Sequence, residues 1–306
     1  MYSSGIRLSF CMKNHLIPTL PFRFRRAGAS LLLALSLAAC TEEKKPDIPA
    51  PTPDPVNTAT NAEAKDYAQY TELVWSDEFN GGGAVDQTKW THETGGSGWG
   101  NNELQYYTNS IENSYQSGGN LVIQTQKQSQ DGRDYTSARL ITKGKQSFTF
   151  GRVDVMAKLP KGQGIWPAIW MLGSDIDQNN WPVCGEIDIM ELRGQEPNKI
   201  LCTMHYGTST ADHRYKGGET TLASGSFADD FHLFSMVRSK DQMRFFVDGR
   251  QYYTFTSSDA SPYPFNNPFF MILNVAVGGN FLGNPNASTQ FPQQMMVDYV
   301  RFYQYK

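Results

Sequence analysis

From residue 70 onward, apolar and polar residues alternate in short segments that end at glycine, aspartate, asparagine or proline. These segments are rich in aromatic and β-branched side chains, and a period of two residues is typical of half-buried β-strands. The pattern predicts strands over residues 120–126, 151–159, 232–239, 242–249, 268–277 and 295–304. Asp248 and Gly249, at the centre of "VDGRQ", predict a hairpin turn.

No segment has the period of a convincing amphipathic helix, and this decides the fold class. Many strands without alternation of strand and helix predict an all-β chain, a sandwich or jelly roll of two stacked antiparallel sheets. No repeat and no second domain is evident, so we expect residues 70–306 to form one domain with a sizeable core.

The first 69 residues differ in composition. "FRFRRAGASLLLALSLAAC", residues 22–40, has the charge, apolar run and small residues of a secretory signal, and the run is short for a membrane-spanning helix. Its ending resembles a bacterial lipobox, which implies removal of residues 1–39 and lipidation of Cys40. An ordinary signal peptide with an incidental cysteine is the alternative. Residues 40–69, rich in Pro, Thr, Ala and charge, predict a flexible tether.

These features predict an exported lipoprotein that is anchored to a membrane. Thr41, rather than aspartate, follows the lipid cysteine, which favours the outer membrane or cell surface. A single lipid chain binds membranes only marginally, so several acyl chains are expected. Residues 1–39 hold five basic and no acidic side chains, so their removal changes the net charge from −3 to −8. Such an acidic protein is a poor partner for nucleic acid, and we expect it to act as a monomer.

The stretch "CGEIDIMELRG", residues 184–194, places three carboxylates within six residues. Glu186 and Asp188 are two apart, so in a strand they share one face while the isoleucines between them point to the other. Glu191 has the wrong parity for that face. A β-bulge near Met190 would return Glu191 to it, and bulges are over-represented next to active sites.

Two carboxyls on one face of a cleft are the catalytic pair of a glycosidase. Retaining enzymes hold them about 5–5.5 Å apart, whereas the backbones of Glu186 and Glu191 would be on the order of 13 Å apart at about 3.3 Å per residue. Long glutamate side chains can close most of that gap, and the short Asp188 can orient the nucleophile. At least one pKa in such a coupled cluster should rise. Spacing alone also leaves open a Ca²⁺ site or a charged strand edge.

"GIWPAIWML" places Trp166 and Trp170 four residues apart with Ala168 between them, so both indoles would lie on one face of a strand. Flat indole rings suit the apolar faces of sugar rings, and two of them would form a saccharide track. Alone, the pattern fits two core tryptophans equally well.

"GEIDIMEL" resembles the active-site motif of glycoside hydrolase family 16. The likeness runs from Leu73 to Tyr305 through "WSDEFNG", "WGNNELQYYT", "GIWPAIWML", "MHYG", "NVAVGGN" and "VDYVRFYQ". It implies a concanavalin-like β-jelly roll whose concave sheet forms the substrate cleft. It also implies that Glu186 is the nucleophile, Asp188 its assisting acid and Glu191 the acid/base, with no cofactor for catalysis.

Within the family, the bulged motif resembles the laminarinase and galactan-degrading branches, whereas lichenase-like and xyloglucan-active members carry a form one residue shorter. "GWGNNELQYYT" favours laminarinase, that is, endo-hydrolysis of β-1,3-glucan. The resemblance implies that an asparagine of this motif contacts sugar on the non-reducing side and that Glu103 shapes that wall. The implied cleft residues are Asn101, Asn102, Glu103, Arg139, Trp166, Trp170 and His205.

His205 also has a physical argument, because it follows Thr203 with strand alternation on a strand expected to pair with the catalytic one. A satisfied core histidine is the alternative. Cys184 shares parity with Glu186, whereas Cys202 has the opposite parity to His205, so a disulfide between the two cysteines would be awkward.

Relatives in the family commonly hold a structural Ca²⁺ on the convex side. The matching positions are Glu78, Gly119 through its carbonyl, and Asp298. Oxygen ligands suit this hard cation, although Asp298 could equally be a strand-edge acid.

Two other functions compete with β-1,3-glucan hydrolysis. A surface lipoprotein could bind glucan without cutting it, but relatives of that kind have typically lost the acids that remain here. Hydrolysis of mixed-linkage glucan, agar or carrageenan is the other alternative. The absence of a basic cluster disfavours the sulfated carrageenan.

Overall fold

The structure, a computed structural model, describes residues 61–306. The predicted signal segment, Cys40 and most of the predicted tether lie outside the described residues. No helix among those residues is long and apolar enough to cross a membrane.

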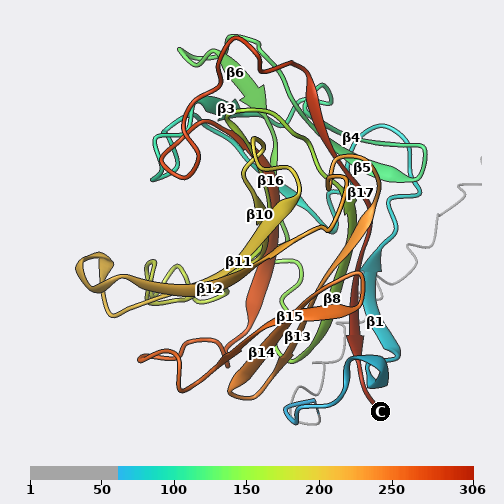
Figure 1. Ribbon diagram of the computed structural model, residues 1–306, viewed down its shortest axis with the longest axis vertical. Helices are drawn as coiled ribbons and strands as arrows, with labels where there is room; N and C mark the ends of the chain where they lie inside the picture. Colours follow the sequence, from blue (N-terminus) through green and yellow to red (C-terminus); the bar gives the residue numbers. More distant parts are fainter. Residues whose placement is uncertain (1–60) are drawn as a thin grey trace, which may run out of the picture. The chain divides into compact units, whose positions relative to one another are not determined.

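The described residues form two large antiparallel sheets (Figure 1). The eight-stranded sheet consists of β1 Glu72–Asp77, β4 Ser114–Ser117, β5 Asn120–Thr125, β8 Gly151–Lys158, β13 His232–Ser239, β14 Gln242–Val247, β15 Arg250–Thr256 and β17 Gln293–Gln304. Its order is β15-β14-β13-β8-β17-β5-β4, and β1 also pairs with β17.

The seven-stranded sheet consists of β2 Thr91–Glu93, β7 Arg139–Ile141, β9 Ile165–Gly173, β10 Glu186–Leu192, β11 Lys199–Tyr206, β12 Arg214–Thr221 and β16 Phe269–Val277. Its order is β12-β11-β10-β9-β16-β7-β2, so β10 has β11 and β12 on one side and β9, β16 and β7 on the other.

Four short elements complete the described part of the chain. β3 Gln105–Tyr107 and β6 Tyr135–Ser137 form a parallel pair, and the helices are the 3₁₀ turns η1 Tyr67–Gln69 and η2 Thr210–Asp212.

All six strands predicted from alternation are present, with ends that differ from the prediction by two residues at most. The hairpin between β14 and β15 turns at Asp248 and Gly249, whose φ angles are 49° and 74°. Two consecutive positive φ values are those of a type I′ turn, for which Asp-Gly is a preferred pair. The predicted all-β sandwich of two antiparallel sheets is confirmed.

The core lies between the two sheets. Its largest cluster joins Val153 and Val155 of β8 to Ile187 of β10 and Met271 of β16. The inward residues of each strand alternate with outward ones, which is the pattern that the sequence shows. The other face of the seven-stranded sheet is left to form the site.

The packed domain begins earlier than the composition predicted, because residues 61–69 lie against the eight-stranded sheet. The Tyr67 ring lies under the Arg152 guanidinium at 4.3 Å, and its hydroxyl contacts Asp154 and Ser235 at 3.3 and 3.2 Å. The main-chain N–H of Tyr305 donates to Asn61 at 2.8 Å. A single aromatic anchor in polar surroundings is too weak a pattern for composition to reveal.

Both described cysteines are free and buried. Cys202 belongs to the main core, whereas Cys184 packs in a smaller cluster with Leu172, Phe270 and Ile272. Burial raises the pKa of Cys184 to about 11 and that of Cys202 to about 12. The parity argument against a disulfide is confirmed.

Candidate active site

A β-bulge in β10 puts all three acids on one face. Asp188 lies opposite Trp170 of β9, and the next residue paired with β9 is Met190, opposite Ile169. One residue of β10 is therefore extra at this point, and Glu191 then lies opposite Ala168. Glu186, Asp188 and Glu191 thus face partners that are two residues apart on the same strand, so the predicted bulge is confirmed.

The extra residue is accommodated on the core side. Ile189 and Met190 are both buried and both belong to the main core cluster. Two consecutive apolar side chains therefore pack inward while the chain advances to the next outward position. This explains why the motif contains the pair Ile-Met where strict alternation would have one apolar residue.

Each glutamate has its own hydrogen-bond donors. Trp181 donates its indole N–H to Glu186 Oε2 at 2.9 Å. Trp166 donates to Glu191 Oε1 at 3.2 Å, and Thr203 donates to the other oxygen of Glu191 at 3.3 Å. Neutral donors hold both carboxylates in place without neutralising their charge.

His205 links the acids to a second histidine. It lies opposite Glu186 on β11, and its Nε2 is 3.7 Å from Glu186 Oε1 and 3.3 Å from Asp188 Oδ2. Its Nδ1 lies 2.8 Å from His213 Nε2. In the tautomer that carries its proton on Nε2, His205 turns an N–H towards the acids, and its Nδ1 can accept a hydrogen bond from His213. The core-histidine alternative is excluded.

The three acids are desolvated together, which favours their protonated forms. Burial raises the pKa of Glu186 to about 8, and the charge of Asp188 adds to the increase. Burial also raises the pKa of Asp188 well above its usual range and raises that of Glu191. Asp188 Oδ2 has no hydrogen-bond partner among the described residues. The cluster can therefore hold a proton at neutral pH, which a general acid requires.

The same cluster contains Glu186, Asp188 and His205, whose ligand atoms lie within 4.8 Å of one another. Calcium prefers six to eight oxygen ligands, so two carboxylates and an imidazole do not fit the calcium alternative. A charged strand edge is also excluded, since β10 lies between β9 and β11.

The tryptophans of β9 lie on the same face as the acids. Trp166 stacks near Phe281 with ring centroids 4.8 Å apart. Trp170 donates to Asn274 at 2.6 Å, and Asn274 in turn donates to the Tyr107 hydroxyl at 2.9 Å. Both indoles are only partly buried, so the prediction that they line one face is confirmed.

The remaining predicted cleft residues belong to one wall beside β9. Glu103 is buried and accepts from Asn101 at 3.4 Å, and burial raises its pKa. Asn102 donates to Asn280 at 3.0 Å. The Arg139 guanidinium lies 4.6 Å from the centre of the Trp170 ring.

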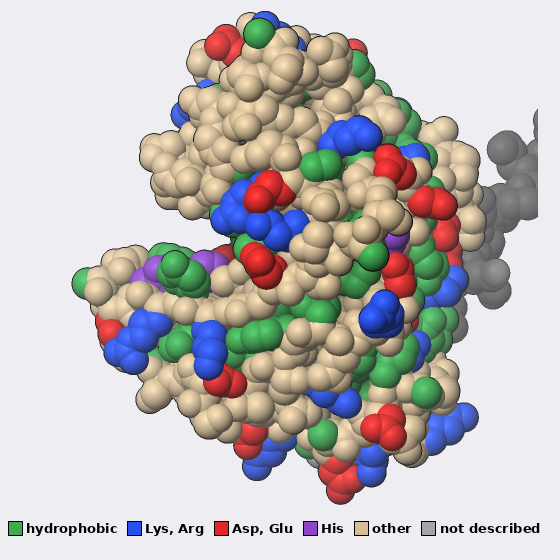
Figure 2. All heavy atoms as spheres, viewed as in Figure 1, with side chains coloured by type: hydrophobic (Ala, Val, Ile, Leu, Met, Phe, Trp, Pro, Cys, Tyr) green, Lys and Arg blue, Asp and Glu red, His purple; other side chains and the backbone are tan. Residues whose placement is uncertain are grey.

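Figure 2 shows a hollow on the molecule, with Asp, Glu, Lys and Arg side chains at its inner end and histidine side chains along its lower edge. The structure thus brings together the three acids, the two tryptophans and His205.

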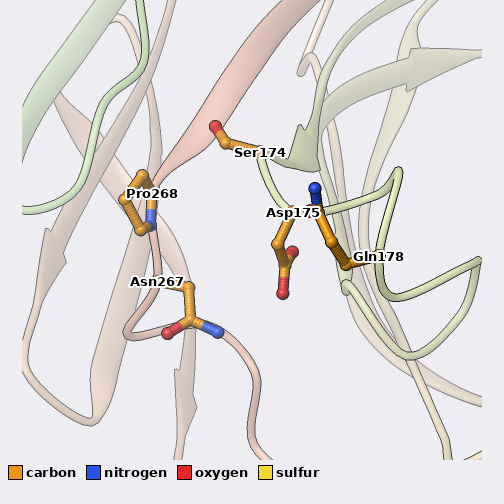
Figure 3. Close-up of a pocket in the computed structure, with 5 residues that line it drawn as sticks. All are labelled: Ser174, Asp175, Gln178, Asn267 and Pro268. Carbon is orange, nitrogen blue, oxygen red and sulfur yellow. The ribbon is translucent and has the colours of Figure 1, made fainter.

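A separate pocket of about 380 Å³ lies between the β9–β10 loop and the segment before β16 (Figure 3). Asp175 and Gln178 face Asn267 and Pro268 across it, and Ser174 completes the lining. It contains none of the predicted site residues and one carboxyl, so it cannot supply a catalytic pair.

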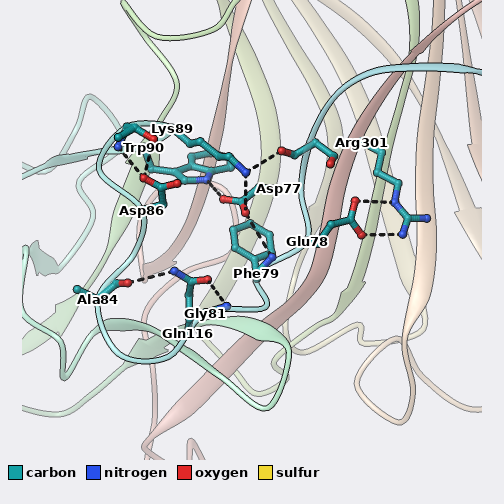
Figure 4. Close-up of polar contacts among 12 residues, drawn as sticks. Asp77, Glu78, Phe79, Gly81, Ala84, Asp86, Lys89, Trp90, Gln116 and Arg301 are labelled. Atoms are coloured by element: carbon teal, nitrogen blue, oxygen red, sulfur yellow. Dashed lines mark hydrogen bonds and ion pairs between the residues drawn. The ribbon is translucent and has the colours of Figure 1, made fainter. Parts of the chain in front are cut away.

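The positions matched to a calcium ion lie beside the middle of β17. Asp77, next to Glu78, pairs with Val300, and Val297 pairs with Leu121. However, Arg301 donates to both oxygens of the Glu78 carboxylate, at 3.0 and 2.7 Å (Figure 4). That carboxylate does not fit a direct calcium ligand, which leaves the Gly119 carbonyl and the exposed Asp298 of the predicted set.

Several residues of the site carry no sequence signal of their own. Trp181 and His213 lie in loops, where no alternation predicts which way a side chain points. Asn274 lies inside an uninterrupted buried strand. The polar side chain of Asn274 within an otherwise apolar strand was the one feature of the sequence that could have identified it as a site residue.

Residues 100–301 match the family described as glycosyl hydrolases family 16. The chain therefore belongs to this family and is a glycoside hydrolase, as its acids and fold predicted.

Relatives and solved structures agree with this assignment. A "Beta-glucanase" of Rhodothermus marinus is 42% identical over 258 residues, which cover 80% of this chain and 89% of that protein. "Glucan endo-1,3-beta-glucosidase A1" of Niallia circulans is 43% identical over 257 residues, covering 76% of this chain and 37% of that protein. The catalytic domain of an endo-1,3-beta-glucanase (laminarinase) from Thermotoga petrophila RKU-1 is 42% identical with a TM-score of 0.72, covering 77% of this chain and 98% of that one.

Proposed function

We propose that this chain hydrolyses internal β-1,3 linkages of laminarin-type glucan with retention of anomeric configuration. The observation that carries the proposal is the bulge that turns Glu186 and Glu191 to the same face of β10. The names of the relatives described above support the β-1,3 linkage. The partly buried indoles of Trp166 and Trp170 supply apolar surfaces on which sugar rings can stack.

The reaction proceeds in two displacements. An oxygen of Glu186 bonds to the anomeric carbon as the glycosidic bond breaks, and Glu191 gives its proton to the departing oxygen. Glu191 then takes a proton from water, whose oxygen bonds to the anomeric carbon while the bond to Glu186 breaks. Asp188 and His205 lie beside Glu186, where they orient its carboxylate and influence its pKa.

The two roles can be separated by azide rescue of Glu186→Ala and Glu191→Ala with an aryl β-laminaribioside. Azide attacks the free sugar face in the first variant and gives the α-glycosyl azide. In the second variant it attacks the glycosyl-enzyme intermediate and gives the β-glycosyl azide. Exchanged products, or wild-type turnover in either variant, would contradict the assignment.

A substrate panel tests the linkage. One relative, "Endo-1,3-1,4-beta-glycanase EglC" of Rhizobium meliloti, is 30% identical, and another, "Keratan-sulfate endo-1,4-beta-galactosidase" of Sphingobacterium multivorum, is 35% identical. We expect kcat/KM to be highest on laminarin, lower on barley glucan and negligible on agarose or carrageenan. A preference for barley glucan or for a galactan would overturn the β-1,3 assignment.

A "Beta-1,3-glucan-binding protein" of Penaeus monodon is 31% identical to this chain, so binding without cleavage needs its own test. All three acids are present here and share one face, which favours cleavage. Release of reducing ends from laminarin by the wild type, and its loss in Glu186→Gln, is the expected result. Binding without any release would support the alternative.

We also propose that the chain is a lipoprotein anchored through Cys40, which lies outside the described residues. The order of basic residues, apolar run and small residues before this cysteine supports the proposal. The full chain, expressed in a Gram-negative host, should incorporate labelled palmitate and sediment with outer membranes. Cys40→Ser should remain unlabelled. An unlabelled wild type would contradict the anchor.

A further inference from the structure

The edge of the site beyond His205 carries an exposed aromatic residue on β12. Tyr215 lies directly opposite His205 in the pairing of β11 with β12. Residues directly opposite each other point to the same face of a sheet, so Tyr215 lies on the face that carries the acids. Its neighbours Arg214 and Lys216 lie opposite Tyr206 and Met204, which belong to the core.

Tyr215 is 70% exposed, and it is one of three large exposed hydrophobic residues in the described part of the chain, with Leu73 and Ile111. Its ring is near the rings of His205 and His213, at centroid distances of 5.8 and 6.0 Å. The ring planes of Tyr215 and His213 differ by 27°. The ring of Trp181 also lies near that of His213, with centroids 4.5 Å apart.

Polar contacts order the segment that leads into β12. Arg214 forms an ion pair with Asp212 at 2.6 Å, and Ser209 accepts from the Asp212 main-chain N–H at 3.3 Å at the start of η2. His213 is fixed by its contact with His205 at 2.8 Å. A surface that is already ordered loses little conformational entropy on binding, which favours recognition.

The strand order places this surface across β10 from the residues that are expected to contact sugars on the non-reducing side. Trp166 and Trp170 of β9 and Arg139 of β7 lie on one side of β10, whereas Tyr215 of β12 lies on the other. A chain that crosses the sheet over the acids therefore has one part on each side of the bond that is cleaved. In Figure 2, hydrophobic and histidine side chains lie together along one edge of the hollow.

We propose that Tyr215 and His213 form a saccharide-binding platform for the leaving-group side of the scissile bond. The ligand is a glucopyranose unit of the substrate, whose apolar face stacks on the tyrosine ring. The same platform would bind the acceptor sugar when the glycosyl-enzyme intermediate reacts with a saccharide rather than water. This inference rests on the proposed function and assigns to β12 the part of the glucan that departs first.

The test compares two substrates of the full chain. Laminarihexaose has sugars on both sides of the scissile bond, whereas β-laminaribiosyl fluoride has a fluoride ion as its leaving group and places no ring on the platform. Tyr215→Ala should lower kcat/KM on the hexaose by about three- to tenfold, because this is the change in rate expected from the loss of one aromatic contact. It should leave kcat/KM on the glycosyl fluoride unchanged and reduce the ratio of transglycosylation to hydrolysis by a similar factor.

Tyr215→Trp should restore the activity on the hexaose, because it keeps a stacking surface. Leu73→Ala is the matched control, since Leu73 is an exposed apolar residue of β1 in the other sheet, and it should match the wild type on both substrates. Equal activity of Tyr215→Ala on the hexaose, or an equal loss on both substrates, would overturn the platform.

Calorimetry separates this proposal from the proposed function. In the Glu186→Gln background, Tyr215→Ala should weaken laminarihexaose binding by the same factor without any turnover. A wild type that failed to cleave the hexaose would refute the function alone. Unchanged affinity in the double variant would refute the platform alone.

Discussion

Replacing Trp181 with phenylalanine should move the acidic limb of the pH–rate profile. The indole N–H of Trp181 donates to Glu186 Oε2 at 2.9 Å, and a donor to a carboxylate stabilises its ionised form and lowers its pKa. Phenylalanine keeps an aromatic ring next to His213 but removes this donor. The nucleophile would then ionise at higher pH, and activity on the acidic side of the profile would fall.

The size of the shift follows from the hydrogen bond. A hydrogen bond to a charged group contributes about 1.5–3 kcal/mol, and one pKa unit corresponds to about 1.4 kcal/mol. The midpoint of the acidic limb should therefore move to a pH about 1–2 units higher. At pH values below that midpoint, kcat/KM should fall about 10- to 100-fold. The limb reports the coupled ionisation of the acids rather than Glu186 alone, so the upper value is reached only if Glu186 dominates it.

The assay is kcat/KM for laminarihexaose between pH 4 and pH 9. Trp170→Phe is the matched control, because Trp170 donates to the neutral Asn274. This control is expected to weaken substrate binding at every pH without moving the limb. A Trp181→Phe profile that keeps the wild-type limb would refute the reasoning, and so would an equal shift in Trp170→Phe.

Three further predictions concern stability. Burial raises the pKa of Asp188 in the folded protein, so this group stabilises the fold below its unfolded pKa, and that contribution is lost as pH rises through the folded pKa. Asp188→Asn should therefore raise Tm at pH 8, by about 2–4 °C for each kcal/mol of stability gained. The increase in Tm should be smaller at pH 4. An equal change at both pH values would contradict this. If calcium binds near Asp298, EGTA should lower the Tm of the wild type and leave Asp298→Ala unaffected, whereas an unchanged wild type would argue against the ion. Because Cys184 and Cys202 are free, a reducing agent should leave Tm unchanged, and a decrease would indicate a disulfide.

The parts of the site that lie on strands could be predicted from the sequence. Alternation gives the face of each side chain, so Glu186, Asp188, Trp166 and Trp170 were placed correctly by parity. The bulge was also predictable, because Glu191 would otherwise point into the core. In each case a local period of two residues carries the information.

The parts that lie on loops could not be predicted in this way. Trp181 reaches Glu186, and His213 reaches His205, because the β9–β10 loop and the turn at η2 bring them over the sheet. No local period in the sequence records such a path. The packing of Tyr67 on β8 likewise depends on residues that are distant in sequence. Loop placement is a tertiary property, and one sequence contains no periodic signal for it.

The most direct test of the shared face of Glu186 and Glu191 is a ¹H NMR time course of laminarihexaose hydrolysis that records the first anomer formed. Carboxyls about 5–5.5 Å apart on one face give a retained product, whereas inverting enzymes hold theirs about 6.5–9.5 Å apart to admit a water molecule. We predict that the β-anomer appears first and then mutarotates to the equilibrium mixture. Initial formation of the α-anomer would contradict the account.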